Sequence, residues 1–311
     1  RRDGNWEIYL MDADGAHQRN LTRHPADDTH PAWSPDGETL AFASDREAPG
    51  GLYTMAADGT DVRLLRAFDT PIAEIVWSPD GAHLAVELHS YPLYATWVIP
   101  ASGGQGVRLA ADWQVVQQPS WSADSRRLAL LLGHGARPGP AIVDREGGEP
   151  RFVWPEDEPC VSVAWSPDGE TLALGLRRHP AERVRFVRPS GEVREDLPAI
   201  EGIVADRLAW SADGTGLYAL DHEPSNNLDV LHVDLGTGNR RWLDADVAIE
   251  GGVAPSPDGQ RLAYAVRTVG GMEIAVLRLE DGAVHMLTRN DVADQQPAWR
   301  PPRSTGSEVV P

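Results

Sequence analysis

A six-residue phrase, Ala-Trp-Ser-Pro-Asp-Gly, recurs along this chain and constrains its fold more than any other feature. The phrase is complete at residues 32–37 and 164–169, and altered copies stand at residues 76–81, 120–125, 209–214, 254–259 and 298–302. Its second position is held by Trp33, Trp77, Trp121, Trp165, Trp210, Pro255 and Trp299, each 44 or 45 residues after the one before. Repeats of this period form propeller blades or solenoid turns.

Each repeat contains four short apolar runs separated by turn residues. In the first complete copy these runs are residues 31–33, 39–43, 52–55 and 62–65. Short runs rich in aromatic and branched side chains and bounded by Gly, Pro and Asp predict strands. The Ser-Pro-Asp-Gly step predicts a tight hairpin, because Pro presets φ at the second turn position and Gly accepts a positive φ. Four antiparallel strands per repeat, without a helical period, predict a propeller blade.

The two ends of the chain predict how the ring closes. Six complete blades begin near residues 31, 75, 119, 163, 208 and 253, while residues 1–22 contain the third and fourth strands of a further blade. Residues 296–300 supply a first strand, so we expect both termini together to form a composite blade that closes the ring. The second strand of that blade is missing from the sequence, so either upstream residues were removed or the closure blade has three strands. We therefore expect an all-β, single-domain, seven-bladed propeller over residues 1–302, followed by a disordered tail at residues 303–311.

The repeat resembles that of TolB-type β-propellers, which are WD40-like. The resemblance rests on Trp-Ser-Pro-Asp-Gly, on residues 8–15 (Ile-Tyr-Leu-Met-Asp-Ala-Asp-Gly) and on residues 297–301, and it covers residues 3–302. Such propellers occur in periplasmic and secreted scaffolds, beside catalytic domains of the prolyl oligopeptidase type, and in a few metal-dependent uronate lyases. The resemblance implies an extracytoplasmic location. The chain departs from TolB in lacking an N-terminal α/β domain and in having one more blade.

Composition narrows the choice of partners. The formal net charge is −19, and all 28 basic residues are Arg, which is typical of a bacterial G+C-rich genome. A strongly acidic surface repels phosphate backbones and anionic lipid, so we expect neither nucleic acid nor a membrane surface as partner. We expect a monomer in which the single cysteine, Cys160, is a buried structural thiol.

The predicted binding site is the mouth of the central channel. The residues three places before each marker are His30, Glu74, Gln118, Ser162, Arg207, Gly252 and Gln296. All but Gly252 are polar, whereas the neighbouring positions two places before the marker are apolar or Pro. Since side chains alternate along a strand, one set is buried and the other points toward the axis. We predict ligand binding by the six polar members, although drift at a solvated position would also diversify them.

A metal site is a second hypothesis for the same face. His30, His89, His134, His179 and His222 could hold a divalent cation, because neutral imidazole suits Zn, Mn or Fe. The resemblance to uronate lyases supports this hypothesis, while the absence of a His-x-x-x-His pair favours solvated loop histidines instead. No cofactor is predicted otherwise.

Other motifs carry little chemistry. Asp36, Asp80, Asp124, Asp168, Asp213 and Asp258 recur in hairpins, where turn chemistry accounts for them. The chain has no Gly-x-Ser-x-Gly elbow, P-loop or dinucleotide fingerprint. The favoured function is a non-catalytic scaffold that binds a protein segment or small ligand. The alternatives are a metal-assisted lyase or hydrolase, and the propeller domain of a larger secreted or peptidase-like protein.

Overall fold

The computed structural model describes residues 4–90, 93–133, 138–154, 159–178, 181–203, 205, 207–222, 228–243, 248–290 and 292–302. The predicted tail at residues 303–311 lies outside the described residues. The secondary-structure elements of the described residues are β-strands. None of these residues forms a helix that is long and apolar enough to span a bilayer.

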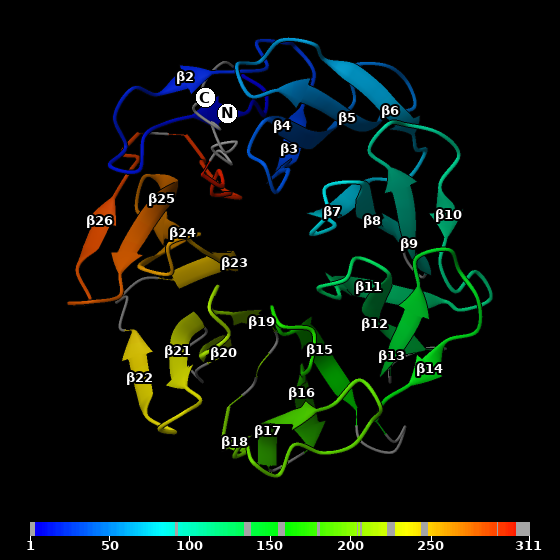
Figure 1. The fold of residues 1–311 in the computed structure, drawn as a ribbon. Coiled ribbons are helices and arrows are strands. Elements are labelled where there is room, and N and C mark those ends of the chain that lie inside the picture. The colour runs from blue at the N-terminus through cyan, green and yellow to red at the C-terminus, as the bar shows by residue number, and fades with distance from the viewer. Residues whose placement is uncertain are drawn as a thin grey trace, which may run out of the picture.

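Six four-stranded antiparallel sheets stand around a central axis, as the repeat predicts (Figure 1). Within each sheet the strands pair in chain order, with the first strand nearest the axis and the fourth at the rim. The blades are, in order, β3 (Asp28–Trp33), β4 (Thr39–Ser44), β5 (Gly51–Ala56) and β6 (Arg63–Ala67); β7 (Ile72–Trp77), β8 (His83–Ser90), β9 (Leu93–Pro100) and β10 (Val107–Arg108); β11 (Val115–Trp121), β12 (Arg127–Gly133), β13 (Gly139–Asp144) and β14 (Arg151–Phe152); β15 (Cys160–Trp165), β16 (Leu172–Arg178), β17 (Ala181–Val187) and β18 (Ile200–Glu201); β19 (Arg207–Trp210), β20 (Gly216–His222), β21 (Leu228–Asp234) and β22 (Arg240–Leu243); β23 (Ala248–Pro255), β24 (Arg261–Thr268), β25 (Gly271–Arg278) and β26 (Val284–Met286).

The Ser-Pro-Asp-Gly turns join first and second strands in the predicted way. In blade 1 the Ser34 hydroxyl donates to Asp36 Oδ1 at 2.5 Å, and that carboxylate accepts the Glu38 N–H at 2.9 Å. Gly37 has φ 69°, a left-handed conformation that Gly adopts without steric cost. The hydrogen bond from Ser34 is the largest cause that lowers the pKa of Asp36. In four other blades the Ser two residues before the Asp lowers its pKa in the same way, at Asp124, Asp168, Asp213 and Asp258. The interpretation of these residues as turn formers is confirmed.

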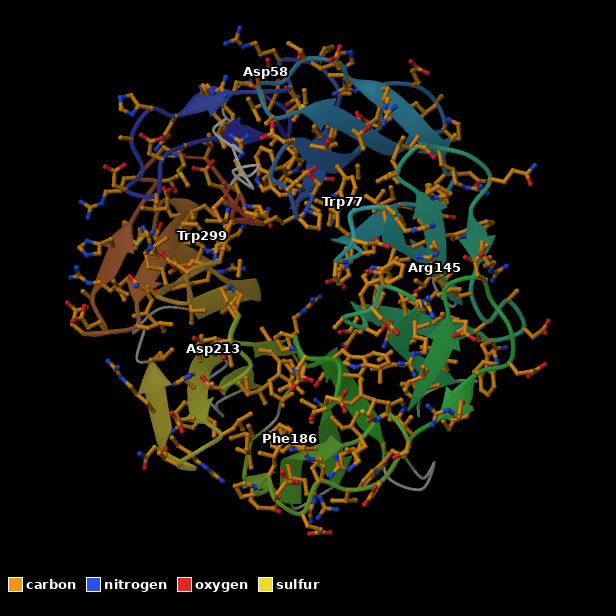
Figure 2. The ribbon with its side chains drawn as sticks, in the orientation of Figure 1. Asp58, Trp77, Arg145, Phe186, Asp213 and Trp299 are labelled. Atoms are coloured by element: carbon orange, nitrogen blue, oxygen red, sulfur yellow. The ribbon has the colours of Figure 1, made fainter. Side chains whose placement is uncertain are left out.

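Four of the marker tryptophans, Trp77, Trp121, Trp165 and Trp210, belong to apolar clusters that join adjacent blades. Figure 2 shows Trp77 near the inner strands. The indole Nε1 of Trp77 donates to the carbonyl oxygen of Ala32 at 2.9 Å, one blade back. Trp121 bonds Val76, Trp210 bonds Ala164 and Trp299 bonds Ala254 in the same way, at 2.8–3.1 Å. The repeated Trp therefore joins apolar packing with one hydrogen bond across each of these blade boundaries.

The core consists of apolar clusters that lie between adjacent sheets. Second strands are the most deeply buried: Leu40, Leu84, Leu128, Leu172 and Leu262 are at most 1% exposed. Cys160 is fully buried, as expected, and its thiol donates to the carbonyl oxygen of Ser162 at 3.2 Å.

The two ends of the chain meet between blade 6 and blade 1. There β1 (Tyr9–Leu10) and β2 (Arg19–Asn20) form a two-stranded sheet. The side-chain amide of Gln18 donates to the carbonyl oxygen of Leu287 at 3.1 Å, beside blade 6. On the other side, the Nε of Arg300 donates to the carbonyl oxygen of Gly37 at 2.7 Å, in blade 1.

Candidate functional site

A β-bulge lies at or beside the predicted channel-mouth position in five of the first strands. Register shifts occur between residues 29 and 32, 72 and 74, 117 and 120, 160 and 162, and 250 and 253. Three mouth residues, His30, Gln118 and Gln296, have φ of 53°, 55° and 57°. A bulge bends the strand and changes the direction of its side chain. Simple strand alternation, on which the prediction relied, is therefore interrupted at this position.

Glu74 and Arg207 approach each other across the channel mouth. Glu74 lies on β7 of blade 2 and Arg207 on β19 of blade 5, on opposite sides of the axis (Figure 1). The guanidinium Nη1 lies 3.7 Å from Glu74 Oε1, and the side chains are 53% and 33% exposed. Burial raises the pKa of Glu74, and the charge of Arg207 opposes that rise. Two predicted site residues thus form a long, partly solvated ion pair.

A buried carboxylate that the sequence prediction missed organises the mouth beside blade 2. Glu87 on β8 is 4% exposed, and its Oε1 lies 2.5 Å from His89 Nε2. Its Oε2 accepts the backbone N–H of Gln118 at 2.6 Å. The Gln118 amide in turn donates to the carbonyl oxygen of Val161 at 3.0 Å. Glu87 therefore links one predicted mouth residue, Gln118, to one predicted metal ligand, His89.

His30 and Gln296 connect the two ends of the chain at the mouth. The backbone N–H of His30 donates to Gln296 Oε1 at 2.8 Å, and His30 Nδ1 lies 3.0 Å from the Thr29 hydroxyl. Burial lowers the pKa of His30, and the charge of His89 lowers it further. His30 is consequently a neutral imidazole at pH 7.

Ser162 does not lie on an open surface, contrary to its predicted role in ligand binding. It is 1% exposed, and its hydroxyl donates to the carbonyl oxygen of Ala205 at 2.5 Å. An ideal Cβ placed on Gly175 would lie in steric conflict with the same hydroxyl, so the space around Ser162 is filled. Its role is a hydrogen bond between blades 4 and 5.

The five histidines proposed as metal ligands are only partly described. The charge of His89 contributes to the lowered pKa of His30. His134 and His179 lie outside the described residues, and the side chain of His222 on β20 is not described. Within the described part of the chain, no three His, Cys, Asp or Glu residues come together as a metal site. The metal hypothesis stays a prediction.

Comparisons with known proteins agree with this architecture. Residues 1–90 match the family model of the TolB beta propeller domain. This part of the chain therefore carries repeats of the TolB propeller type. TolB from Acinetobacter baumannii is 17% identical with a TM-score of 0.62, over 88% of this chain and 66% of that protein. Comparison with curated protein sequences gives no match.

Two enzymes have a similar fold. An oligogalacturonate lyase in complex with manganese is 16% identical with a TM-score of 0.72, over 92% of this chain and 84% of the lyase. A puromycin-hydrolyzing peptidase from Mycobacterium tuberculosis is 17% identical with a TM-score of 0.71, over 96% of this chain and 51% of the peptidase. At such identities the likenesses establish the fold. The chain spans just under two thirds of TolB and about half of the peptidase.

Proposed function

We propose that this chain is a binding propeller that recognises a protein segment or small ligand at its channel mouth. The observation that carries the proposal is the ion pair between Glu74 and Arg207, held at 3.7 Å across the axis. A partly exposed pair at this separation contributes little net stability. A ligand with one cationic and one anionic group can therefore replace it at little cost.

The groups around the channel mouth favour ligand binding over catalysis. Glu87 is engaged by His89 and by the Gln118 backbone, and Ser162 is buried against Ala205. The amide of Gln118 and the imidazole of His30 border the mouth beside the ion pair and offer directional hydrogen bonds. A peptide that carries both Arg or Lys and Asp or Glu fits this set, because each charge would meet its opposite on the wall.

An array of random dodecapeptides, followed by calorimetric titration of the best binders, tests the proposal. We expect the double variant Glu74→Gln with Arg207→Gln to lose at least tenfold in affinity. The matched control, Arg188→Gln with Glu192→Gln, removes an exposed pair at 3.4 Å on blade 4 and should bind like the parent. Equal binding by both double variants would contradict the proposal.

A metal-assisted lyase or hydrolase is the second candidate. The observations that favour it are the lowered pKa of His30, to which the charge of His89 contributes, and the likeness to the manganese-bound oligogalacturonate lyase. Its ligands would come from His30, His89, His134, His179 and His222. Elemental analysis together with an assay on uronate oligomers with added manganese tests it. Retention of turnover by His30→Ala with His89→Ala would reject this candidate.

The third candidate is the propeller domain of a larger secreted or peptidase-like protein. Its support is that this chain spans about half of the Mycobacterium tuberculosis peptidase. TolB-type repeats favour an extracytoplasmic location, and the net charge of −19 disfavours nucleic acid and anionic membranes as partners. The gene sequence on both sides of this chain tests the candidate directly.

We also propose that the ring has seven blades in a monomer, with residues 1–22 and 296–300 forming the closure blade. The bonds from Gln18 to Leu287 and from Trp299 to Ala254 support this arrangement, as does the bond from Arg300 to Gly37. A cysteine pair that replaces Gln18 and Leu287 should form a disulfide under oxidation in a protein of monomeric mass. Dimers linked by the same pair would contradict it.

A further inference from the structure

The imidazole of His89 is oriented at the channel mouth by a buried carboxylate. Its Nε2 lies 2.5 Å from Oε1 of Glu87, and the His89 side chain is 48% exposed while that of Glu87 is 5% exposed. The other carboxylate oxygen, Oε2, accepts the backbone N–H of Gln118 at 2.6 Å. Because both oxygens of Glu87 are engaged, the carboxylate is a fixed partner for the imidazole.

Two further contacts hold the His89 ring in place. Tyr94, its cross-strand partner on β9, packs edge-on against it with ring centroids 4.7 Å apart and an interplanar angle of 85°. Edge-to-face ring pairs of this kind are favourable. The backbone N–H of His89 donates to the carbonyl oxygen of Pro71 at 3.1 Å. The ring is therefore held in one orientation although half of its side chain is exposed.

The contact with Glu87 decides which ring nitrogen of His89 carries the proton. An ionised carboxylate accepts hydrogen bonds and cannot donate them, so Nε2 is the protonated nitrogen of the neutral imidazole. Nδ1 is then a lone-pair acceptor. Among the described residues, the hydrogen bond of the His89 ring runs to Glu87. Nδ1 is therefore the ring nitrogen through which His89 can bind a ligand.

Glu74 places a second acceptor on the same face of blade 2. Glu74 on β7 is the direct cross-strand partner of Glu87, and His89 stands two positions beyond Glu87 on β8. Paired residues on neighbouring strands share a face of the sheet, as do residues two apart on one strand. Glu74 and His89 therefore flank the buried Glu87 carboxylate on one face, with a charged and a neutral acceptor.

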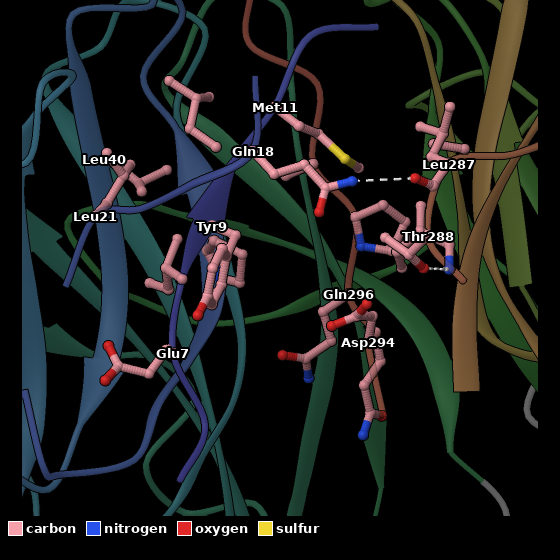
Figure 3. A pocket seen from close by; sticks show the side chains of 18 of the residues that line it. Glu7, Tyr9, Met11, Gln18, Leu21, Leu40, Leu287, Thr288, Asp294 and Gln296 are labelled. Carbon is pink, nitrogen blue, oxygen red and sulfur yellow. Dashed lines mark hydrogen bonds between the residues drawn. The ribbon is translucent and has the colours of Figure 1, made fainter. Parts of the chain in front are cut away.

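The other walls of the mouth are less suited to a cation. Figure 3 shows Gln296 near Asp294 on the C-terminal segment. Oε1 of Gln296 accepts the backbone N–H of His30 at 2.8 Å, so this acceptor is already engaged. Arg207, on blade 5, offers donors. Blade 2 therefore presents the stronger acceptors, because one of them is a carboxylate.

We propose that Glu74 and neutral His89 form the subsite for the cationic group of the ligand, and that this group is a guanidinium. The inference rests on the proposed binding function of the channel mouth and adds the chemical class that its blade 2 side accepts. A planar guanidinium carries five N–H donors in a fixed fork, so it can donate to the Glu74 carboxylate and to His89 Nδ1 together. An ammonium is a compact point charge without this fork. Glu87 is a positioning residue, because it keeps the proton on Nε2.

Titration of methylguanidinium into protein labelled with nitrogen-15 histidine tests the subsite without a peptide. The signals of His89 are assigned by their loss in His89→Asn. At pH 8 we expect a protonated Nε2 and an unprotonated Nδ1. Methylguanidinium should shift the Nδ1 signal in a saturable way, and methylammonium should bind at least fivefold more weakly. A ring protonated at both nitrogens, or equal affinity for the two cations, would overturn the proposal.

Glu87→Gln tests the positioning role. The backbone N–H of Gln118 requires the new amide oxygen as its acceptor, so the amide NH₂ group faces His89. Nε2 must then accept, and the proton should move to Nδ1, which the nitrogen-15 shifts report directly. Methylguanidinium should bind at least fivefold more weakly. The matched control, Glu146→Gln, changes an exposed carboxylate at the β13–β14 turn and should leave the tautomer and the affinity unchanged.

Two variants of His89 separate hydrogen bonding from packing. His89→Asn keeps an acceptor oxygen near the place of Nδ1, whereas His89→Leu keeps bulk without any acceptor. We expect methylguanidinium affinity in the order parent, His89→Asn, His89→Leu. The melting temperature of each variant without ligand shows whether the fold is retained. Equal affinity of the two variants would show that His89 does not contact the cation.

The subsite and the proposed binding function fail in different ways. If dodecapeptides bind through Glu74 and Arg207 while methylguanidinium leaves the His89 signals unchanged, the channel-mouth function stands and the guanidinium subsite is wrong. If methylguanidinium binds as expected and no dodecapeptide does, the subsite stands and peptide recognition is wrong.

Discussion

The guanidinium of Arg300 donates a 2.7 Å hydrogen bond from Nε to the carbonyl oxygen of Gly37, 263 positions earlier in the chain. The same guanidinium lies 5.0 Å from the ring centroid of Trp33. Arg300 thus joins the C-terminal segment to the first turn of blade 1. A hydrogen bond from a charged donor and a cation–π contact are together large enough to detect by substitution.

We expect Arg300→Ala to lower the free energy of unfolding by about 2 kcal/mol, because it removes both contacts. Urea denaturation followed by tryptophan fluorescence measures the change. The control, Arg289→Ala, removes an exposed Arg at the end of blade 6 and should stay within about 0.5 kcal/mol of the parent. Equal stability of the two variants would show that the Arg300 contacts do not hold the ends together.

The buried ion pair of Asp28 and Arg46 predicts a dependence of stability on pH. Burial raises the pKa of Asp28, and hydrogen bonds from Ser44 and Arg46 oppose that rise. A carboxyl whose pKa is raised in the folded state contributes stability at low pH and loses it as the pH rises through that pKa. Removing Arg46 raises this pKa further.

Arg46→Met should therefore destabilise the protein by about 3–5 kcal/mol at pH 7, and by clearly less near pH 4. Thermal unfolding between pH 4 and 8 measures the difference. Adding Asp28→Asn to this variant removes the buried charge, so the double variant should lose the pH dependence. A pH-independent loss in Arg46→Met alone would assign the effect to its packing over Phe42 and Tyr53 instead.

The turn residue Asp36 predicts the opposite dependence. The hydrogen bond from the Ser34 hydroxyl is the chief cause that lowers the pKa of Asp36. The contribution of Asp36 to folding stability is therefore present above the unfolded pKa near 3.9, and it is lost as the pH falls through the folded pKa. Ser34→Ala should cost about 1–2 kcal/mol at pH 7, since Asp36 and the Thr39 N–H both lose a buried partner. The cost should shrink below about pH 4. A cost that grows on acidification would contradict this account.

The indole hydrogen bonds predict a graded effect of Trp replacement. Trp121→Phe removes the bond to the partly buried Val76 carbonyl at 3.1 Å, so we expect a loss of about 1–3 kcal/mol. Trp242→Phe changes a side chain that is 48% exposed and should cost less than about 0.5 kcal/mol. Urea denaturation compares them, and a reversed order would show that ring packing outweighs the hydrogen bond.

The repeat predicted the blades well because its signals are local. Turn residues and apolar runs placed the starts of the second strands within about one residue of the observed starts, since Leu-Ala or Leu-Tyr follows each hairpin directly. The observed second strands continue up to about four residues beyond the predicted ends. First strands are longer than predicted: β3 begins at Asp28 and not at Pro31. The strand continues past the bulge at His30, and variable residues before the marker gave no apolar pattern to indicate this.

The site was harder to predict because it depends on contacts between distant blades. Glu74 and Arg207 were both expected at the mouth, but their pairing across the axis depends on side-chain reach. Glu87 carried a signal that was overlooked, namely a carboxylate within the apolar run Leu84-Ala85-Val86-Glu87-Leu88. Ser162 carried no such signal, because burial against Ala205 depends on how closely blades 4 and 5 approach.

The left-handed backbone at His30, Gln118 and Gln296 limits which residues evolution or design can install at the mouth. With φ of 53–57°, these positions suit Gly, Asn and Asp, whereas Val, Ile and Thr would strain the main chain. A combinatorial library that varies the mouth should exclude β-branched residues at these three sites. Specificity can then be changed there without loss of the scaffold.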